Sequence, residues 1–147
     1  METRTGKNFS AVDAGAWRDL AQHVYGHPKG GSFRGKLFLK ELLGMTSMEV
    51  SLGRLPPGAG LPFLHRHQEH EEVYIFVGGR GQFQVDGEIL EVHEGTVVRV
   101  APDGARSWRN NSTGDLYYIC VQATQGTMKG DTTRDGVGVD RPMTWPT

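Results

Sequence analysis

Glycine-rich turns that alternate with short apolar segments are the feature that most limits the fold of this chain. Glycine occurs 21 times in 147 residues, about twice its usual share of roughly 7%. The glycines form no single tract; they separate short segments rich in Val, Ile, Phe and Tyr. This pattern is typical of many short strands joined by tight turns, and it predicts an all-β domain.

The turn signals are most regular in the middle of the chain. Asp86-Gly87 stands between two alternating segments and predicts a two-residue hairpin, because a type I′ turn needs positive φ at both central positions. Regular spacing without intervening helices indicates an antiparallel sandwich or barrel. The expected strands are 36–40, 48–52, 61–67, 72–77, 81–85, 88–92, 96–100, 105–110 and 115–122.

The two ends differ from this central part. The first nine residues show no pattern and are expected to be loose, whereas Ser10 and Asp13 have capping-box spacing before an apolar face. That spacing predicts a short helix over 11–23. The end of the chain is rich in Thr, Gly, Asp and Pro and is expected to be irregular. The expected organisation is an N-terminal helical extension at 1–32, a β-barrel domain at 33–122 and a C-terminal tail at 123–147.

Composition argues against several classes of function. The chain carries 16 Lys+Arg against 17 Asp+Glu, whereas a binder of nucleic acid or of anionic membranes needs a strongly basic face. Its apolar runs are far shorter than the roughly 20 residues that span a bilayer. The N-terminus lacks the apolar stretch of a secretory signal, and Cys120 is the only cysteine. We therefore expect a cytoplasmic protein with no nucleic-acid or membrane partner.

A cluster of histidines is the strongest sign of chemistry. His65, His67 and His70 fall within six residues, and side chains two apart on a strand share a face, so His65 and His67 can point the same way. Glu71 or Glu72 on the next strand would add a carboxylate. Two imidazoles and one carboxylate suit a divalent transition metal with open positions, iron being the best-known occupant. The alternative is a solvated polar loop.

The same residues resemble a known family. Gly58, His65, His67, Glu72 and Gly79 are similar to the first conserved motif of the cupins: a glycine, His-x-His, four residues, a glutamate, six residues and a glycine. The gap from the first glycine to His65 is one residue longer than usual. The resemblance implies an RmlC-like jelly roll, the double-stranded β-helix barrel, that forms a homodimer. It also implies metal ligands at His65, His67 and Glu72 for a divalent Fe, Mn, Ni, Cu or Zn ion.

The block from Gly95 through Pro102 and Gly104 to Asn110 or Asn111 looks like the second cupin motif. Cupins usually place a fourth metal ligand, a histidine, in this block. With both motifs and the segment between them, the resemblance covers about residues 45–122.

This second motif departs from the family pattern at the ligand position. No histidine follows His93. Counting from the glycine that opens the block puts the ligand position on Arg106, and counting from its proline puts it on Ser107. Arginine has no acceptor, and a neutral hydroxyl is a weak metal ligand. Three readings stay open: a three-ligand metal site, a fourth ligand from His70 or Gln84, or a pocket that has lost its metal.

Two further residues are predicted to bind substrate. If Arg106 faces the interior it needs an anionic partner, which would be Glu71, Glu72 or a carboxylate or phosphate of the substrate; strand alternation equally permits an outward side chain. Tyr74 shares the strand face of Glu72, and its hydroxyl needs a partner that a ligand could supply. Cys120 is expected to be a buried small hydrophobe.

The function expected from these features is that of a metal-binding cupin acting on a small organic molecule, which is an anion if Arg106 faces the interior. A metal-dependent enzyme of the oxygenase or isomerase type is one class, since a fold alone does not fix a reaction. The alternative is a non-enzymatic small-molecule-binding cupin that has lost full metal coordination.

Overall fold

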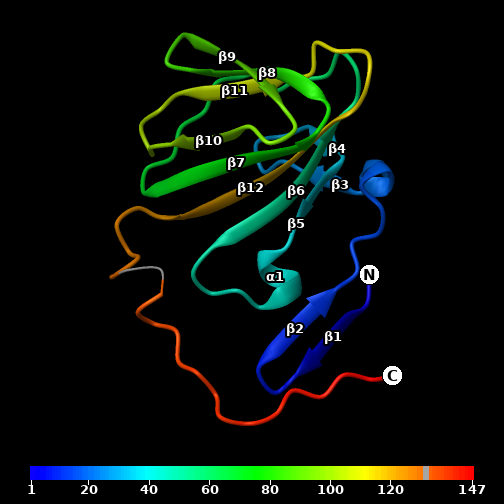
Figure 1. Ribbon diagram of the computed structural model, residues 1–147. Coiled ribbons are helices and arrows are strands. Elements are labelled where there is room, and N and C mark those ends of the chain that lie inside the picture. The colour runs from blue at the N-terminus through cyan, green and yellow to red at the C-terminus, as the bar shows by residue number, and fades with distance from the viewer. Residues whose placement is uncertain (131–132) are drawn as a thin grey trace.

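The computed structural model describes residues 1–130 and 133–147, and it consists of two antiparallel sheets with extensions beside them (Figure 1). The larger sheet has the strand order β10-β7-β12-β6-β5, and the smaller has the order β11-β8-β9. Their strands are β5 Lys36–Phe38, β6 Glu49–Leu55, β7 His70–Gly78, β8 Arg80–Val85, β9 Glu88–His93, β10 Val97–Val100, β11 Arg106–Arg109 and β12 Leu116–Thr124.

The predicted hairpin between β8 and β9 is present. Asp86 has φ 51° and Gly87 has φ 88°, the two positive values that a type I′ turn requires. The Asp86 carboxylate also accepts a hydrogen bond from the Ala105 amide at 2.9 Å. The turn therefore fixes both the β8–β9 register and the approach of the chain to β11.

The core lies between the facing sides of the two sheets. It is built of apolar side chains from six strands, which alternate with polar residues along each strand. This arrangement is the all-β jelly roll that the strand pattern predicts. The two sheets are not joined into a closed barrel, which corrects the expectation of closure. The buried cluster comprises Tyr74, Phe76, Phe83, Val92, Val98, Val100, Trp108, Leu116, Tyr118 and Cys120.

The expected strand at 61–67 is instead a loop that follows the edge of β11. Two isolated bridges tie it there, Gly60 to Arg109 and His65 to Arg106. Pro62 lies between them and has no amide hydrogen to continue a ladder. The pairing register shifts between the two bridges, so the segment is held to β11 without forming a regular strand.

The predicted N-terminal helix over 11–23 is wrong. The first residues form a hairpin of β1, Thr3–Gly6, and β2, Phe9–Val12. Gly15 then has φ 77°, and only the 3₁₀ helix η1, Trp17–Gln22, follows. The two expected capping side chains bond elsewhere: Ser10 donates to the Leu43 carbonyl oxygen, and Asp13 accepts from the Gly15 amide. Without a cap, one short helical segment is all that forms.

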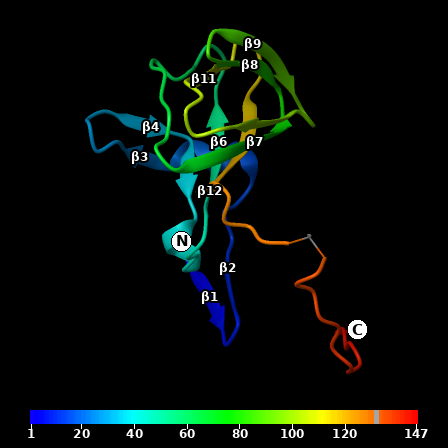
Figure 2. The same ribbon diagram turned by 90° about the vertical axis from the view of Figure 1, so that its left-hand side faces the viewer.

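The remaining elements surround one side of the larger sheet. A second hairpin, β3 Val24–Gly26 with β4 Ser32–Arg34, projects beside the sheets (Figure 2), and the four-residue helix α1, Lys40–Leu43, connects β5 to β6. After β12 the described chain has no strand or helix, as expected for the tail. None of the helices in the described segments is long and apolar enough to cross a membrane. The proposed domain boundaries at residues 32 and 122 stay a prediction.

Candidate metal centre

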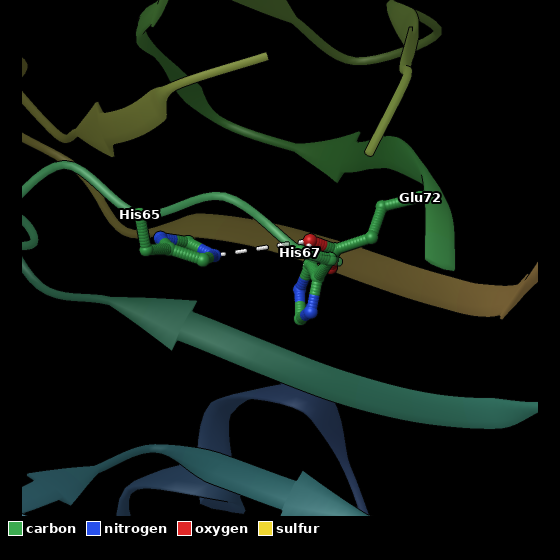
Figure 3. A group of neighbouring side chains, drawn as sticks. All are labelled: His65, His67 and Glu72. Carbon is green, nitrogen blue, oxygen red and sulfur yellow. Dashed lines mark ion pairs between the residues drawn. The ribbon is translucent and has the colours of Figure 1, made fainter. Parts of the chain in front are cut away.

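The two histidines of the His-x-His motif and Glu72 come together in space (Figure 3). Their ligand atoms all lie within 4.8 Å of one another. The Glu72 Oε1 atom is 2.7 Å from His67 Nε2 and 3.8 Å from His65 Nε2. The loop before β7 carries both imidazoles, and β7 itself carries the carboxylate, as the sequence pattern predicts.

Backbone hydrogen bonds fix the loop that carries the histidines. The His65 amide donates to the Arg106 carbonyl oxygen at 3.1 Å, and the Arg106 amide donates back to His65 at 2.9 Å. The His67 amide donates to the Pro102 carbonyl oxygen at 3.0 Å. The position of both imidazoles is therefore set by β11 and the turn before it.

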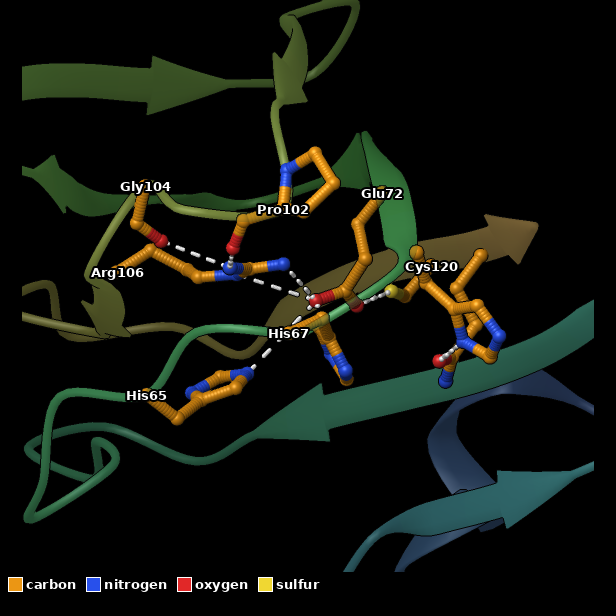
Figure 4. Close-up of polar contacts among 9 residues, drawn as sticks. His65, His67, Glu72, Pro102, Gly104, Arg106 and Cys120 are labelled. Carbon is orange, nitrogen blue, oxygen red and sulfur yellow. Dashed lines mark hydrogen bonds and ion pairs between the residues drawn. The ribbon is translucent and has the colours of Figure 1, made fainter. Parts of the chain in front are cut away.

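Arg106 faces inward and is paired with Glu72 (Figure 4). Its side chain is fully buried, and its Nε and Nη2 atoms donate to Glu72 Oε1 at 3.1 and 2.5 Å. Its Nη1 donates to the carbonyl oxygens of Pro102 and Gly104 at 3.2 and 2.7 Å. Buried charges need this kind of compensation. The guanidinium thus stands beside the metal-ligand cluster, fully engaged by the protein.

Ser107, the alternative to Arg106, and Glu71, the alternative partner of Arg106, form other contacts. Ser107 donates to the Leu61 carbonyl oxygen at 3.1 Å, away from Glu72. Glu71 pairs with Arg99 at 2.7 Å on the exposed side of β7. Strand alternation explains both outcomes, because neighbours along a strand point to opposite faces. Of the alternatives left open for the Arg106 side chain, the structure shows the inward orientation, with Glu72 as the partner.

Glu72 is only 3% exposed and is ionised. Burial alone would raise the pKa of its carboxyl group, but contacts with His65, His67 and Cys120 and the positive charge of Arg106 hold that pKa far below its usual range. A carboxylate that is bonded from several sides favours its charged form. The group is therefore fixed in orientation and kept as an anion.

Cys120 on β12 is buried, as expected, and touches the same carboxylate. Its Sγ donates to Glu72 Oε2 at 2.9 Å. Burial, followed by the charge of Glu72, raises the pKa of the thiol, while the charge of Lys36 acts in the opposite direction. The sulfur therefore stays protonated at neutral pH and serves as a donor to Glu72.

Tyr74 is part of the buried core. Its side chain is fully buried, with the ring 4.8 Å from those of Phe83 and Trp108. The hydroxyl has no hydrogen-bond partner among the described residues, and burial raises its pKa. A role for Tyr74 or Arg106 in binding substrate stays a prediction; the contacts seen are with the protein core.

His70 does not belong to the cluster of His65, His67 and Glu72, and Gln84 is expected on the other face of β8, because its neighbour Phe83 is in the core. His70 stacks against His67 with ring centroids 5.9 Å apart, and its Nδ1 lies 2.9 Å from Gln122 Oε1. Gln84 lies on β8, paired with Ser107 and Ile89. Among the described His, Cys, Asp and Glu side chains, the group that could hold a metal has three members.

A cavity of about 330 Å³ opens beside this group. His65, His67 and Glu72 lie in its wall together with Cys120 and Trp108. Much of the opposite wall comes from the N-terminal region, which sequence reasoning assigned no role in the site. These added residues are Tyr25, His27, Phe33, Arg34, Lys36 and Phe38. The alternation of Lys36, Leu37 and Phe38 on a strand was a signal that two of these side chains share one face.

The donor set fits a divalent transition metal ion. Ligand atoms about 2.1 Å from an ion lie roughly 3 Å apart, and Nε2 of His67 and Oε1 of Glu72 are 2.7 Å apart. Two imidazoles and one carboxylate leave coordination positions open for a ligand. Arg106 is the residue of β11 that contacts Glu72.

Comparisons with known proteins agree with this architecture. Residues 51–122 match the family model of the cupin domain. The crystal structure of a cupin protein from Bacteroides fragilis is 38% identical with a TM-score of 0.68, covering 71% of this chain and 88% of that one. An oxalate-binding protein of Thermotoga maritima is 27% identical over 93 residues, which are 63% of this chain and 76% of that protein. The crystal structure of a predicted oxalate decarboxylase from the same organism, 23% identical with a TM-score of 0.58 over 69% of this chain and 90% of that one, shares the fold. This chain belongs to the cupin family.

Proposed function

We propose that this cupin holds a divalent transition metal on His65, His67 and Glu72 and acts as a metal-dependent enzyme on a small anionic organic molecule. The observation that carries the proposal is the position of these three side chains in the wall of the cavity. An ion held there would present its open positions to the cavity. When bound, it would supply Lewis-acid or redox chemistry, so the oxygenase and isomerase classes both stay within the proposal.

Charge favours an anionic ligand. The Glu72 carboxylate is already compensated by Arg106, so a bound divalent ion would keep its double positive charge. Arg34 and Lys36 also line the cavity and have no carboxylate partner in the described structure, while Glu72 is the one carboxylate among the described lining residues. A positive cavity concentrates anions. The name of the oxalate-binding relative supports the same class of ligand.

The chain's own residues would then have separate tasks. His65 and His67 hold the ion with neutral imidazole nitrogens. Glu72 supplies the carboxylate, which Arg106 and Cys120 keep in one orientation. Trp108 and the aromatic residues of the cavity wall exclude water from the bound molecule.

A second candidate is a metal-free binding cupin, and one specific observation favours it. Arg106 already supplies the positive charge that Glu72 needs, so the cluster is electrostatically complete without an ion. In that case His65 and His67 would hydrogen-bond directly to an anionic ligand. This candidate predicts ligand binding that is unaffected by removal of metal.

A cobalt titration separates the two candidates. Tag-free protein, freed of metal with a chelator, is titrated with Co²⁺ while the visible absorption is recorded, and oxalate is then added. The proposal predicts saturable binding and a spectral change on adding oxalate, since the anion enters open positions. His65→Ala and His67→Ala should each weaken Co²⁺ binding by at least about 10-fold.

His93→Ala is the matched control, because His93 is exposed and bonds to the Glu94 carbonyl oxygen. It should bind Co²⁺ as the wild type does. Equal cobalt affinity in all four proteins would contradict the assigned ligands. Oxalate binding that is the same with and without Co²⁺ would favour the metal-free candidate.

Cytoplasmic location and a homodimer remain part of the proposal. The edge position of β5 in the larger sheet supports a dimer, because an exposed edge strand can pair with a second chain. Light scattering coupled to size-exclusion chromatography tests this. A mass close to twice the 16.2 kDa of one chain would support the dimer, and a monomer mass would contradict it.

A further inference from the structure

Lys36 on β5 has a side chain that lacks a polar partner in the described structure. It is half-buried and lies in the cavity wall. Its Nζ atom is 5.0 Å from the centre of the Tyr118 ring and 5.2 Å from that of the Phe38 ring. No hydrogen bond or ion pair of Nζ occurs among residues 1–130 and 133–147. The three N–H donors of this ammonium are therefore unused by the protein.

The other cationic side chains at this site each have at least one polar partner in the protein. Arg34 Nη1 donates to the Ala21 carbonyl oxygen at 3.0 Å. Arg54 Nε is paired with Asp115 at 2.9 Å. Arg106, behind Glu72, has its donors directed at the protein. Among the described lysines and arginines at this site, Lys36 is the one without a hydrogen bond or ion pair, so all three of its N–H donors are available to a ligand.

A glycine of β6 leaves room for the aromatic ring that contacts this lysine. Gly53 is paired with Lys36 on one side and with Tyr118 on the other. A Cβ atom at Gly53 would overlap the Tyr118 ring. Glycine therefore allows the ring to lie across β6 beneath the ammonium, where its face attracts the positive charge.

Aromatic rings form another part of the same cavity wall. Phe33 of the β3–β4 hairpin and Phe63 of the loop before β7 have ring centroids 6.1 Å apart. His65 lies between Phe63 and Trp108, 6.0 and 5.9 Å from their centroids. The rings extend the apolar wall from the hairpin to the metal ligands, and aromatic groups pack well against such faces.

We propose that Lys36 binds the carboxylate of the ligand and that the ligand is an aryl carboxylate whose ring packs against Phe33, Phe63 and Trp108. This inference rests on the proposed anionic ligand and names its class. A charge-assisted hydrogen bond from the ammonium holds the anionic end. The ring wall selects a planar apolar body, for which the cavity of about 330 Å³ has room.

Benzoate and benzamide are suitable probes because they share a ring and differ in charge. Each is titrated calorimetrically into cobalt-loaded wild type, Lys36→Met and Lys7→Met. Methionine keeps the length and apolar contacts of Lys36, and Lys7 is an exposed lysine in the β1–β2 turn, which makes it a control for net charge. Lys36→Met should weaken benzoate binding by about 10-fold or more. Benzamide binding should change by less than about 2-fold, and Lys7→Met should match the wild type.

Phe63→Ala separates the ring wall from the charge. Phe63 is 41% exposed, so its removal is expected to leave the fold intact. It should weaken benzoate and benzamide together and weaken oxalate binding by a smaller factor. Equal weakening of oxalate would overturn the assignment of an aromatic body.

The outcomes distinguish this inference from the proposed function. If Lys36→Met binds benzoate as tightly as the wild type, Lys36 is not the anion anchor, even where Co²⁺ and oxalate binding are intact. If the wild type binds benzoate no better than benzamide, the aryl carboxylate class is wrong. If the wild type itself does not bind Co²⁺, the proposed metal centre is wrong.

Discussion

Arg106 and Lys36 are two cations of the cavity region, and they differ in what they contact. Arg106 on β11 is fully buried, and its donors are directed at Glu72 and two backbone carbonyl oxygens. Lys36 on β5 is half-buried and rests on two aromatic rings without a polar partner in the described structure. The difference indicates that Arg106 holds the protein's own carboxylate, whereas Lys36 is available for a carboxylate from outside.

Removing Arg106 should have the largest effect on stability. Arg106→Met leaves Glu72 buried beside the thiol of Cys120 without a countercharge, which should cost about 3–5 kcal/mol in the free energy of unfolding. Urea denaturation of the variant and the wild type measures the loss. A loss below about 1 kcal/mol would contradict the structural role of the ion pair.

A double variant controls for the lost packing. Arg106→Met combined with Glu72→Gln removes both charges, so the penalty of an unpaired buried anion disappears. The double variant should be more stable than Arg106→Met alone, with a coupling free energy of about 0.5–3 kcal/mol. If the effects of the two single substitutions on the free energy of unfolding simply add, Arg106 and Glu72 do not stabilise each other, which would contradict the role given to Arg106.

Gly53→Ala should have an intermediate effect on stability, because Gly53 lies between Lys36 of β5 and Tyr118 of β12. The added Cβ would displace the Tyr118 ring, and overpacking of this kind costs about 1–3 kcal/mol. Gly26→Ala on β3 is the control, because a Cβ there meets nothing within 4 Å. Thermal unfolding of both variants tests this; equal melting temperatures would show that the ring does not depend on Gly53.

Acid should weaken the ion pair between Glu72 and Arg106. Because the pKa of Glu72 is lowered in the folded protein from its ordinary value of 4.5, its stabilising contribution is complete above that value. The contribution falls as the pH drops below it, because the unfolded chain binds the proton first. The expected slope is about 1.4 kcal/mol per pH unit for this one group.

Stability measured between pH 6 and pH 3 tests this expectation. The wild type should lose more stability over that range than the Arg106→Met/Glu72→Gln double variant, which lacks the carboxylate. Parallel curves for the two proteins would show that Glu72 is not the group responsible.

The smallest effect on folding is expected for Lys36→Met. The lysine has no ion pair to lose among the described residues, only its contacts with two aromatic rings, so the free energy of unfolding should change by about 1 kcal/mol or less. Urea denaturation beside Arg106→Met measures this directly. A loss as large as that of Arg106→Met would mean that Lys36, too, serves the fold.

Local signals in the sequence predicted the central strands and the three metal-binding candidates. Asp86-Gly87 determines its own turn conformation, and His65, His67 and Glu72 are close in sequence. The failed helix after Ser10 shows where such signals stop. Its capping residues found other partners, Leu43 and Gly15, and contacts with distant segments decided the outcome.

The partners of the two cations depend on tertiary structure. Arg106 meets Glu72 across a separation of 34 residues, and strand alternation alone left its direction open. Lys36 reaches the cavity because β5 pairs with β6 beside Gly53 and Tyr118. Neither arrangement has a local sequence signature, so the sequence alone indicates Arg106 as the anion-binding residue and does not indicate Lys36.

The most direct test of the central claim, that this cupin carries a three-ligand metal centre, is the metal content of the protein purified without a tag or chelating resin. Inductively coupled plasma mass spectrometry should find about one transition-metal ion per chain, and His67→Ala should lose it while His93→Ala keeps it. Less than about a tenth of an ion per wild-type chain, with none bound after incubation with Fe, Mn, Ni, Cu or Zn salts, would contradict the claim.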